Sequence, residues 1–159
     1  MECTVYLEKP DDFVVQREAA GCYFWCQDKL LLLKRHESKP QGGTWGVPAG
    51  KVEADESARD CVIREMQEEL GLHVGDDLHD MGRLYVQLGT LSYIFHMFFK
   101  PCAAFPELTL LLDENSEARW VTHDEALALP LIKAGKEAIF CLKEYVKKQD
   151  NRIGEAPTG

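Results

Sequence analysis

Three glutamates, Glu65, Glu68 and Glu69, have side chains and a spacing suited to chemistry at a metal ion. On a helix, residues three and four positions apart are neighbours, so these carboxylates would share one face. Like charges at this spacing repel one another, whereas a hard divalent cation such as Mg²⁺ or Mn²⁺ binds carboxylate oxygens and reverses the sign of that interaction. A solvated acidic face is the alternative interpretation, and the surrounding residues must decide between the two.

The stretch Gly50–Leu72 contains the helix that would position these glutamates. Its apolar side chains fall on an arc beside the acidic face, where they would dock the helix on a core: Val62, Ile63, Met66 and Leu70. Gly71 follows as a C-cap, because glycine readily adopts the left-handed conformation that ends many helices. Asp55 precedes the helix and is a candidate for its N-terminal cap. Gly50 would permit a close approach that a Cβ would obstruct.

The same stretch resembles the Nudix box, G-x5-E-x7-R-E-U-x-E-E-x-G-U, in which U is an aliphatic residue. Every specified position is filled, in order by Gly50, Glu56, Arg64, Glu65, Met66, Glu68, Glu69, Gly71 and Leu72. The resemblance covers 23 of the 159 residues. Because the matching residues stand at fixed offsets from the acidic cluster, a metal site is favoured over a solvated helix face.

The resemblance implies a divalent-metal-dependent hydrolase that cleaves a diphosphate linkage in a nucleoside diphosphate joined to another moiety. Glu68 and Glu69 would be direct ligands of Mg²⁺ or Mn²⁺, and Glu65 would be a ligand or would orient the attacking water. Arg64 would pair with carboxylates of the box, and a backbone carbonyl near Gly50 would complete the metal shell. A bound divalent cation neutralises phosphate charge and lowers the pKa of a bound water. The predicted catalytic residues are therefore Glu65, Glu68, Glu69 and Arg64.

A further carboxylate from a distant loop often serves such proteins as an additional metal ligand or as the general base. The candidates here are Glu114 and Glu117, upstream of Trp120, and we predict Glu114 as the ligand. A solvated acidic loop is the alternative for both. The identity of the general base, the number of metal ions and the phosphorus that is attacked stay open.

The order of elements predicts one α/β domain over residues 1–150, followed by a flexible tail over 151–159. Strands are expected over 4–7, 19–26, 29–35, 81–88, 91–101 and 118–121, and helices from 122 and over 132–148. The consecutive leucines Leu30–Leu33 predict a strand buried on both faces, paired with its predecessor through a turn at Gln27–Asp28. The resemblance implies the Nudix fold, a mixed β-sheet sandwiched between helices.

Two strands carry the predicted contacts to substrate. Lys34 and Arg35 end the strand 29–35 and enter a loop containing glycines, so we predict that both bind phosphate; a polar strand end is the alternative. In the strand 91–101, Tyr93, Phe95, Met97 and Phe99 alternate with a second set of residues. One face must contact the core and the other could line a pocket for a base, and the pattern leaves open which. Phe95 is the predicted apolar contact.

Two other side chains have structural interpretations. Trp45 could stack on a base, but for a tryptophan in a loop beside Pro48 we favour packing. We interpret His96 as a satisfied strand histidine rather than a catalytic base, because no acidic or nucleophilic partner can be identified from the sequence.

The composition favours a cytoplasmic protein that acts on small molecules. The formal net charge of −9 makes nucleic acid and anionic membranes unexpected partners, because both are bound by basic surfaces. A small polyphosphate remains compatible, since bound metal and a few local cations can offset its charge. The six cysteines show neither a C-x-x-C pair nor zinc spacing and suit reduced thiols in the cytosol. The sequence shows no signal-peptide pattern and no apolar run of transmembrane length.

The substrate is the feature that the sequence determines least. Nudix proteins that favour ADP-ribose often carry a proline about sixteen residues beyond the box, where this chain has Val86, Gln87 and Leu88. Tyr85 and Tyr93 lie on either side of the place where dinucleoside polyphosphate hydrolases often carry a tyrosine. The additional upstream motif of the coenzyme A type is not seen.

By elimination, the predicted substrate is a nucleoside triphosphate, unmodified or oxidised, cleaved to a monophosphate and pyrophosphate. ADP-ribose or a nucleotide sugar is the alternative. An RNA-end pyrophosphohydrolase would want a basic track beside its cleft, which the net charge disfavours. A non-catalytic nucleotide-binding module is a further alternative, disfavoured by the complete box. Both a monomer and a homodimer fit the sequence.

Overall fold

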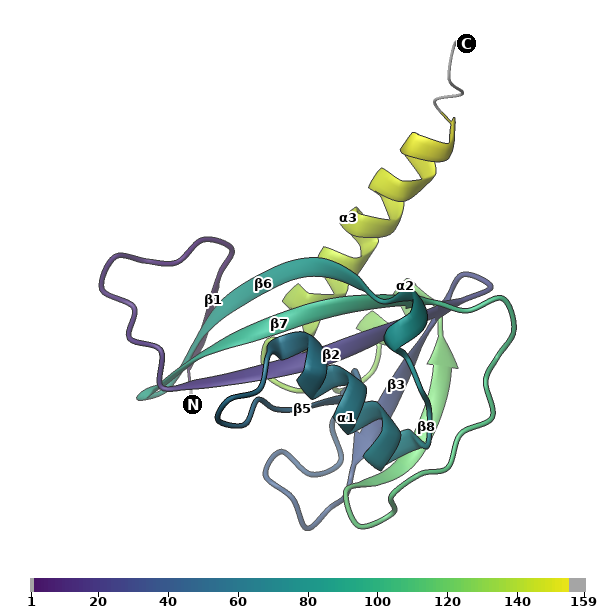
Figure 1. The fold of residues 1–159 in the computed structure, drawn as a ribbon. Coiled ribbons are helices and arrows are strands. Elements are labelled where there is room, and N and C mark those ends of the chain that lie inside the picture. The colour runs from purple at the N-terminus through teal and green to yellow at the C-terminus, as the bar shows by residue number, and fades with distance from the viewer. Residues whose placement is uncertain (1, 155–159) are drawn as a thin grey trace.

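One mixed β-sheet with helices on both faces forms the protein (Figure 1). The computed structural model describes residues 2–154, with side chains described through residue 151. In chain order the elements are β1 (Cys3–Tyr6), β2 (Arg17–Cys26), β3 (Lys29–Arg35), β4 (Trp45–Gly46), β5 (Ala49–Lys51), α1 (Ala58–Leu70), the 3-10 helix η1 (Gly75–Asp77), β6 (His79–Leu88), β7 (Leu91–Pro101), β8 (Asn115–Val121), α2 (His123–Leu127) and α3 (Gly135–Gly154). The predicted arrangement of a mixed sheet between helices is confirmed.

The alternation of apolar residues along β3 explains why helices cover both faces. Leu30 and Leu32 point into the core shared with α2 and α3, whereas Leu31 and Leu33 point into the core shared with α1. All four leucines are at most 3% exposed, as predicted for a strand buried on both faces. Because both faces are hydrophobic, each requires a covering layer.

A fork between β2 and β3 opens the sheet. The strands meet at the turn formed by Gln27 and Asp28, whose positive φ angles of 50° and 61° are typical of a type I′ hairpin. After two residue pairs they separate, and β2 pairs with β7 in parallel and with β5, while β3 pairs with β8 and β4. The predicted hairpin is thus confirmed at its turn, and the segment from β4 to β5 lies inside the fork.

Local signals at both ends of α1 determine where this helix begins and ends. Ser57 is the N-cap, and its hydroxyl accepts a hydrogen bond from the Asp60 N–H at 3.0 Å. Gly71 is the C-cap, with a φ of 69°. The predicted C-cap is therefore confirmed. The predicted N-cap was wrong, because Asp55 lies two residues too early for its side chain to take the place of Ser57.

Several element boundaries differ from those predicted. β8 begins at Asn115 rather than at residue 118, because its pairing with β3 continues to Arg35. α3 begins at Gly135 rather than at residue 132 and extends to Gly154, with its last turns projecting away from the sheet (Figure 1). The predicted tail, 151–159, therefore begins inside this helix, and 155–159 lie outside the described residues. The division into a domain and a tail stays a prediction.

Two observations bear on the surroundings of the protein. Within residues 2–154, no helix combines the length and the hydrophobicity needed to cross a membrane. All six cysteines are free thiols. The cytoplasmic location stays a prediction.

Candidate active site

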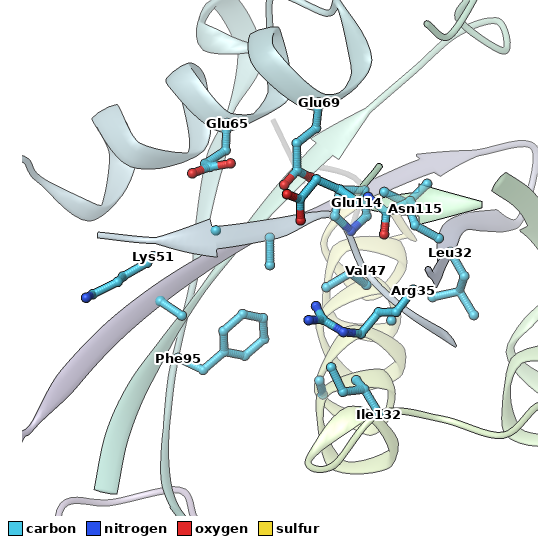
Figure 2. Close-up of a pocket in the computed structure, with 18 of the residues that line it drawn as sticks. Leu32, Arg35, Val47, Lys51, Glu65, Glu69, Phe95, Glu114, Asn115 and Ile132 are labelled. Atoms are coloured by element: carbon cyan, nitrogen blue, oxygen red, sulfur yellow. The ribbon is translucent and has the colours of Figure 1, made fainter. Parts of the chain in front are cut away.

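A pocket with a volume of about 520 Å³ lies at the fork, between α1, β5, β7, the loop before β8 and the start of α3. Its two sides differ in character. The lining includes carboxylates, from Glu65, Glu68, Glu69 and Glu114, and apolar side chains, among them Val47, Tyr93, Phe95 and Ile132. Figure 2 shows Glu65 and Glu69 on one side, with Phe95 and Ile132 on the opposite side. A ligand with one anionic end and one apolar end would match this division.

Arg64 connects the acidic face of α1 to the loop that precedes this helix. Its Nε and Nη2 donate to the two carboxylate oxygens of Glu56 at 2.7 and 3.0 Å, which makes a bidentate pair. Its Nη1 donates to Glu65 at 2.9 Å and to Glu68 at 3.3 Å. The hydrogen bonds from Arg64 lower the pKa of Glu56 to about 2. Arg64 thus orients two carboxylates of the pocket and is itself anchored by a third outside it.

Glu65 packs directly against the backbone of β5 at Gly50. A Cβ at residue 50 would overlap the Cγ and the carboxyl carbon of Glu65. Gly50 pairs with Ala20 of β2, so the backbone is held in place on its other side. The position of the Glu65 carboxylate, which is only 14% exposed, therefore depends on the missing side chain at Gly50.

Glu69 lies where the carboxylates from α1 and from the loop before β8 meet. Its burial raises its pKa to about 8, with further increases from the negative charges of Glu65 and Glu114, while Arg35 acts in the opposite direction. Figure 2 shows the carboxylates of Glu69 and Glu114 beside one another. Glu114 also pairs with Lys39 at 3.1 Å.

The chemistry of this acidic end suits a divalent cation. Mutual repulsion disfavours the ionised form of Glu69, and a hard cation with oxygen ligands would relieve that repulsion. In the structure, however, Glu65 and Glu68 accept hydrogen bonds from Arg64. No three His, Cys, Asp or Glu side chains in the described part of the chain are close enough to form a ready metal site. The predicted ligands, Gly50, Glu65, Glu68, Glu69 and Glu114, therefore stay a prediction that requires side-chain movement.

Comparison with known proteins decides the family. A family model described as the NUDIX domain matches residues 15–142, which include both the helix α1 and the pocket. The chain belongs to the Nudix hydrolase family. The predicted family and enzyme class are confirmed at this level.

Solved Nudix structures share the fold. The NUDIX domain of Shewanella oneidensis NrtR, solved in complex with ADP ribose, superposes with a TM-score of 0.71 over 87% of this chain and 94% of that chain, at 18% sequence identity. At this identity the likeness shows the fold alone. The predicted Nudix fold is confirmed.

Two curated relatives illustrate how far the sequence similarity extends. The CTP pyrophosphohydrolase of Escherichia coli (strain K12) is 34% identical over 108 residues, covering 67% of this chain and 76% of the relative. YvcI of Bacillus subtilis (strain 168), an uncharacterized Nudix hydrolase, is 43% identical over 58 residues. That match covers 36% of this chain, and it spans about a third (34%) of the Bacillus protein.

The Nudix pocket contains two of the three residues predicted to bind substrate. Arg35 and Phe95 line it, whereas Lys34 is not among the described residues that do so. Neighbouring residues of a strand point to opposite faces, so β3 directs only one of its two terminal cations into the pocket. On β7, Tyr93 and Phe95 both line the pocket, which answers the open question of which face does so.

Sequence reasoning missed several pocket residues, including Lys51, Asn115 and Ile132. Lys51 directly follows Gly50, so a basic residue within the box was an available signal. Asn115 and Ile132 had none, because long-range pairing brings them to the pocket: β8 pairs with β3, and the Ile132 N–H donates to the Trp45 carbonyl at 2.9 Å.

The contacts of Trp45 and His96 support the interpretation of both as structural residues. Trp45 is 4% exposed and lies in the core, with the Arg119 guanidinium 4.8 Å from the centre of its ring. The Nε2 of His96 lies 2.8 Å from the Glu18 carboxylate, which is the partner that the sequence could not identify. Neither side chain is among the described residues that line the pocket.

The raised pKa of Glu69 predicts how the stability of the metal-free protein depends on pH. In the folded chain this pKa is about 8, against an ordinary value of 4.5, so between these values the folded state binds more protons than the unfolded state. The free energy of unfolding should therefore fall as pH rises through this window. Glu69→Gln has no carboxylate to ionise there and should gain stability relative to wild type, by at most a few kcal/mol.

Thermal unfolding of both proteins in a chelator, from pH 5 to pH 9, measures this difference. Glu144→Gln, an exposed position on α3, is the matched control and should follow wild type at every pH. A constant difference between wild type and Glu69→Gln across the range would contradict the prediction.

Proposed function

We propose that this Nudix protein hydrolyses a diphosphate linkage in a nucleoside triphosphate, unmodified or oxidised, to a monophosphate and pyrophosphate, with Mg²⁺ or Mn²⁺ as cofactor. One observation carries the proposal: carboxylates of the Nudix box and an apolar wall line the same pocket. Phosphates with bound cations suit the acidic end, and a nucleobase suits the wall formed by Tyr93, Phe95 and Ile132.

The side chains at the acidic end would have different roles in the reaction. A divalent cation held by Glu65, Glu68 and Glu69 supplies neutralisation of the phosphate charge and a lower pKa for the attacking water. Arg64 holds Glu65 and Glu68 beside one another through its hydrogen bonds, and these carboxylates would turn from Arg64 towards the cation when it binds.

Two residues outside the box would assist. The Arg35 guanidinium lines the pocket, and its charge and planar donors suit a phosphate group of the substrate. Glu114 lies beside Glu69, where a carboxylate could accept a proton from the attacking water or join the metal ligands. Its ion pair with Lys39 holds the loop before β8 against the loop after β3.

The sequence relatives support a triphosphate over the alternatives. The relative named CTP pyrophosphohydrolase is matched over most of its length. ADP-ribose, or a nucleotide sugar, is the second candidate, and it is supported by the ADP ribose complex of the NrtR domain, at lower identity. The net charge of −9 disfavours an RNA end as substrate, and the complete box disfavours a module that binds nucleotides without cleaving them.

A panel of nucleotides incubated with Mg²⁺ or Mn²⁺ tests the proposal. It should contain the eight common nucleoside triphosphates, 8-oxo-dGTP, ADP-ribose, a nucleotide sugar, a dinucleoside polyphosphate and a triphosphorylated RNA, with the products separated by chromatography. We expect at least one triphosphate to be converted to monophosphate and pyrophosphate, and a chelator to stop the reaction. Faster cleavage of ADP-ribose or of the RNA end would replace the proposed substrate, and the absence of both turnover and metal binding would favour the binding module.

A further inference from the structure

The side chain of Asn115 is an unusual component of the pocket. Asn115 is the first residue of β8 and is only 8% exposed, and it is one of two buried polar residues within the described part of the chain. The other, Ser92, donates a hydrogen bond to the Val14 carbonyl. In Figure 2, Asn115 lies next to Glu114, on the same side of the pocket as Leu32 and Arg35.

The Asn115 amide is open to the pocket: the fully buried side-chain atoms that lack a partner among the described residues are Tyr23 Oη and His123 Nδ1. The backbone N–H of Asn115 donates to the Leu111 carbonyl at 3.1 Å, but no hydrogen bond of its side chain occurs among those formed by the described residues. In the free protein, water in the pocket can pair with the donor and the acceptor of this amide, and a ligand group that matches them can take the place of that water.

A β-bulge in strand β8 determines the position of the Asn115 side chain. Lys34 of β3 is opposite Glu117, whereas the next residue, Arg35, is opposite Asn115, so Ser116 is an extra residue in β8. Such a bulge changes the direction in which the following side chains point and is frequent beside active sites. As a result Asn115 and Arg35 are cross-strand neighbours, and both line the pocket.

Arg35 and Asn115 differ in charge and in hydrogen-bonding groups, so they suit different parts of a nucleotide. Arg35 carries a positive charge, and its Nε donates to the Pro40 carbonyl at 2.8 Å, which anchors the guanidinium. It suits phosphate oxygens. The Asn115 amide is uncharged and offers one donor group beside one acceptor. That combination matches the edge of a nucleobase, where donors and acceptors stand side by side, better than it matches a phosphate, which offers acceptors alone.

We propose that Asn115 is a specificity-determining residue, whose side-chain amide forms hydrogen bonds with the edge of the nucleobase and so selects among bases. The inference rests on the proposed function, because it assumes that the pocket takes a nucleotide. The apolar wall would hold any base by contact area, and the amide distinguishes one base from another. A base that does not match displaces water from the amide without replacing its hydrogen bonds, which weakens the binding of that base.

Binding of non-hydrolysable nucleotides tests this role separately from catalysis. Dissociation constants of the α,β-methylene triphosphates of adenosine, guanosine, cytidine and uridine are measured by calorimetry with Mg²⁺ present. For the wild type, we expect the best-bound base to exceed the weakest by about tenfold or more, the order expected for one or two hydrogen bonds. In Asn115→Leu, which keeps the size of the side chain but removes its polar atoms, the four constants should lie within about twofold of one another.

Two further variants separate recognition from folding. Asn115→Ala should lose the preference as Asn115→Leu does, and both should unfold in one transition near the wild-type temperature. Ser116→Ala changes the adjacent exposed residue and should keep the preference. Should one of the two Asn115 variants fail to fold, the other decides.

Three results would overturn the inference: equal binding of all four bases by wild type, an unchanged preference in Asn115→Leu, or a uniform loss of affinity for all four bases. The last of these would indicate a contact to the phosphate or the sugar. If the protein binds the analogues with a preference that depends on Asn115 but hydrolyses no triphosphate, the proposed function fails while this inference stands.

Discussion

Glu69→Gln is expected to lower the turnover of the preferred nucleotide by about a thousandfold or more. Glu69 lies between Glu65 and Glu114 at the acidic end of the pocket, where a metal ligand can connect α1 to the loop before β8. The amide keeps the size of the side chain but removes the negative charge that a hard cation requires. Stabilisation of a transition state by a metal amounts to several kcal/mol, and each 1.4 kcal/mol or so corresponds to a factor of ten in rate.

Initial rates at saturating Mg²⁺ or Mn²⁺, together with metal affinity from calorimetry, measure this effect. Glu144→Gln makes the same chemical change on the exposed face of α3 and should leave both quantities unchanged. If Glu69→Gln turns over the nucleotide within threefold of the wild-type rate, Glu69 is not a catalytic residue, and the other carboxylates must bind the metal.

Gly50→Ala is expected to reduce activity by about a hundredfold while leaving the protein folded. The new Cβ would occupy the space of the Glu65 carboxylate, and β2 holds the backbone of β5 in place from the other side. Glu65 must then turn away, which also disturbs its hydrogen bond with Arg64. A misplacement of about 1 Å at a catalytic group can cost a hundredfold in rate.

Activity, metal affinity and unfolding temperature should be measured for this variant and for Gly75→Ala. The control also adds a methyl group to a glycine, but its tightest neighbour is the Ile63 Cδ1 at 3.3 Å, so it should be tolerated. A double-mutant cycle tests whether overlap with the Glu65 side chain causes the effect of Gly50→Ala. In a Glu65→Ala background, Gly50→Ala should lower the unfolding temperature little, because the overlapping side chain is absent. An equal loss in both backgrounds would point to strain in β5 itself.

Local sequence determined most of the elements and the acidic face. The strand Lys29–Arg35 was predicted with its observed bounds, and so was the end of α1 at Gly71. Such signals act over a few residues: an apolar run, a turn residue, a glycine that accepts positive φ. The offsets of the Nudix box act in the same way, because one turn of helix brings Glu65, Glu68 and Glu69 to one face.

Only the tertiary structure decided which residues share the pocket. Lys34 and Arg35 are neighbouring cations in the sequence, yet of the two only Arg35 lines the pocket. Asn115 lines the pocket because of a bulge in β8, which no local sequence pattern predicts. Likewise, the fork between β2 and β3 follows from their competing pairings with β7 and β8 rather than from the turn that joins them. Periodicity within a segment is a local property of the chain, whereas the composition of a pocket depends on contacts between residues far apart in sequence.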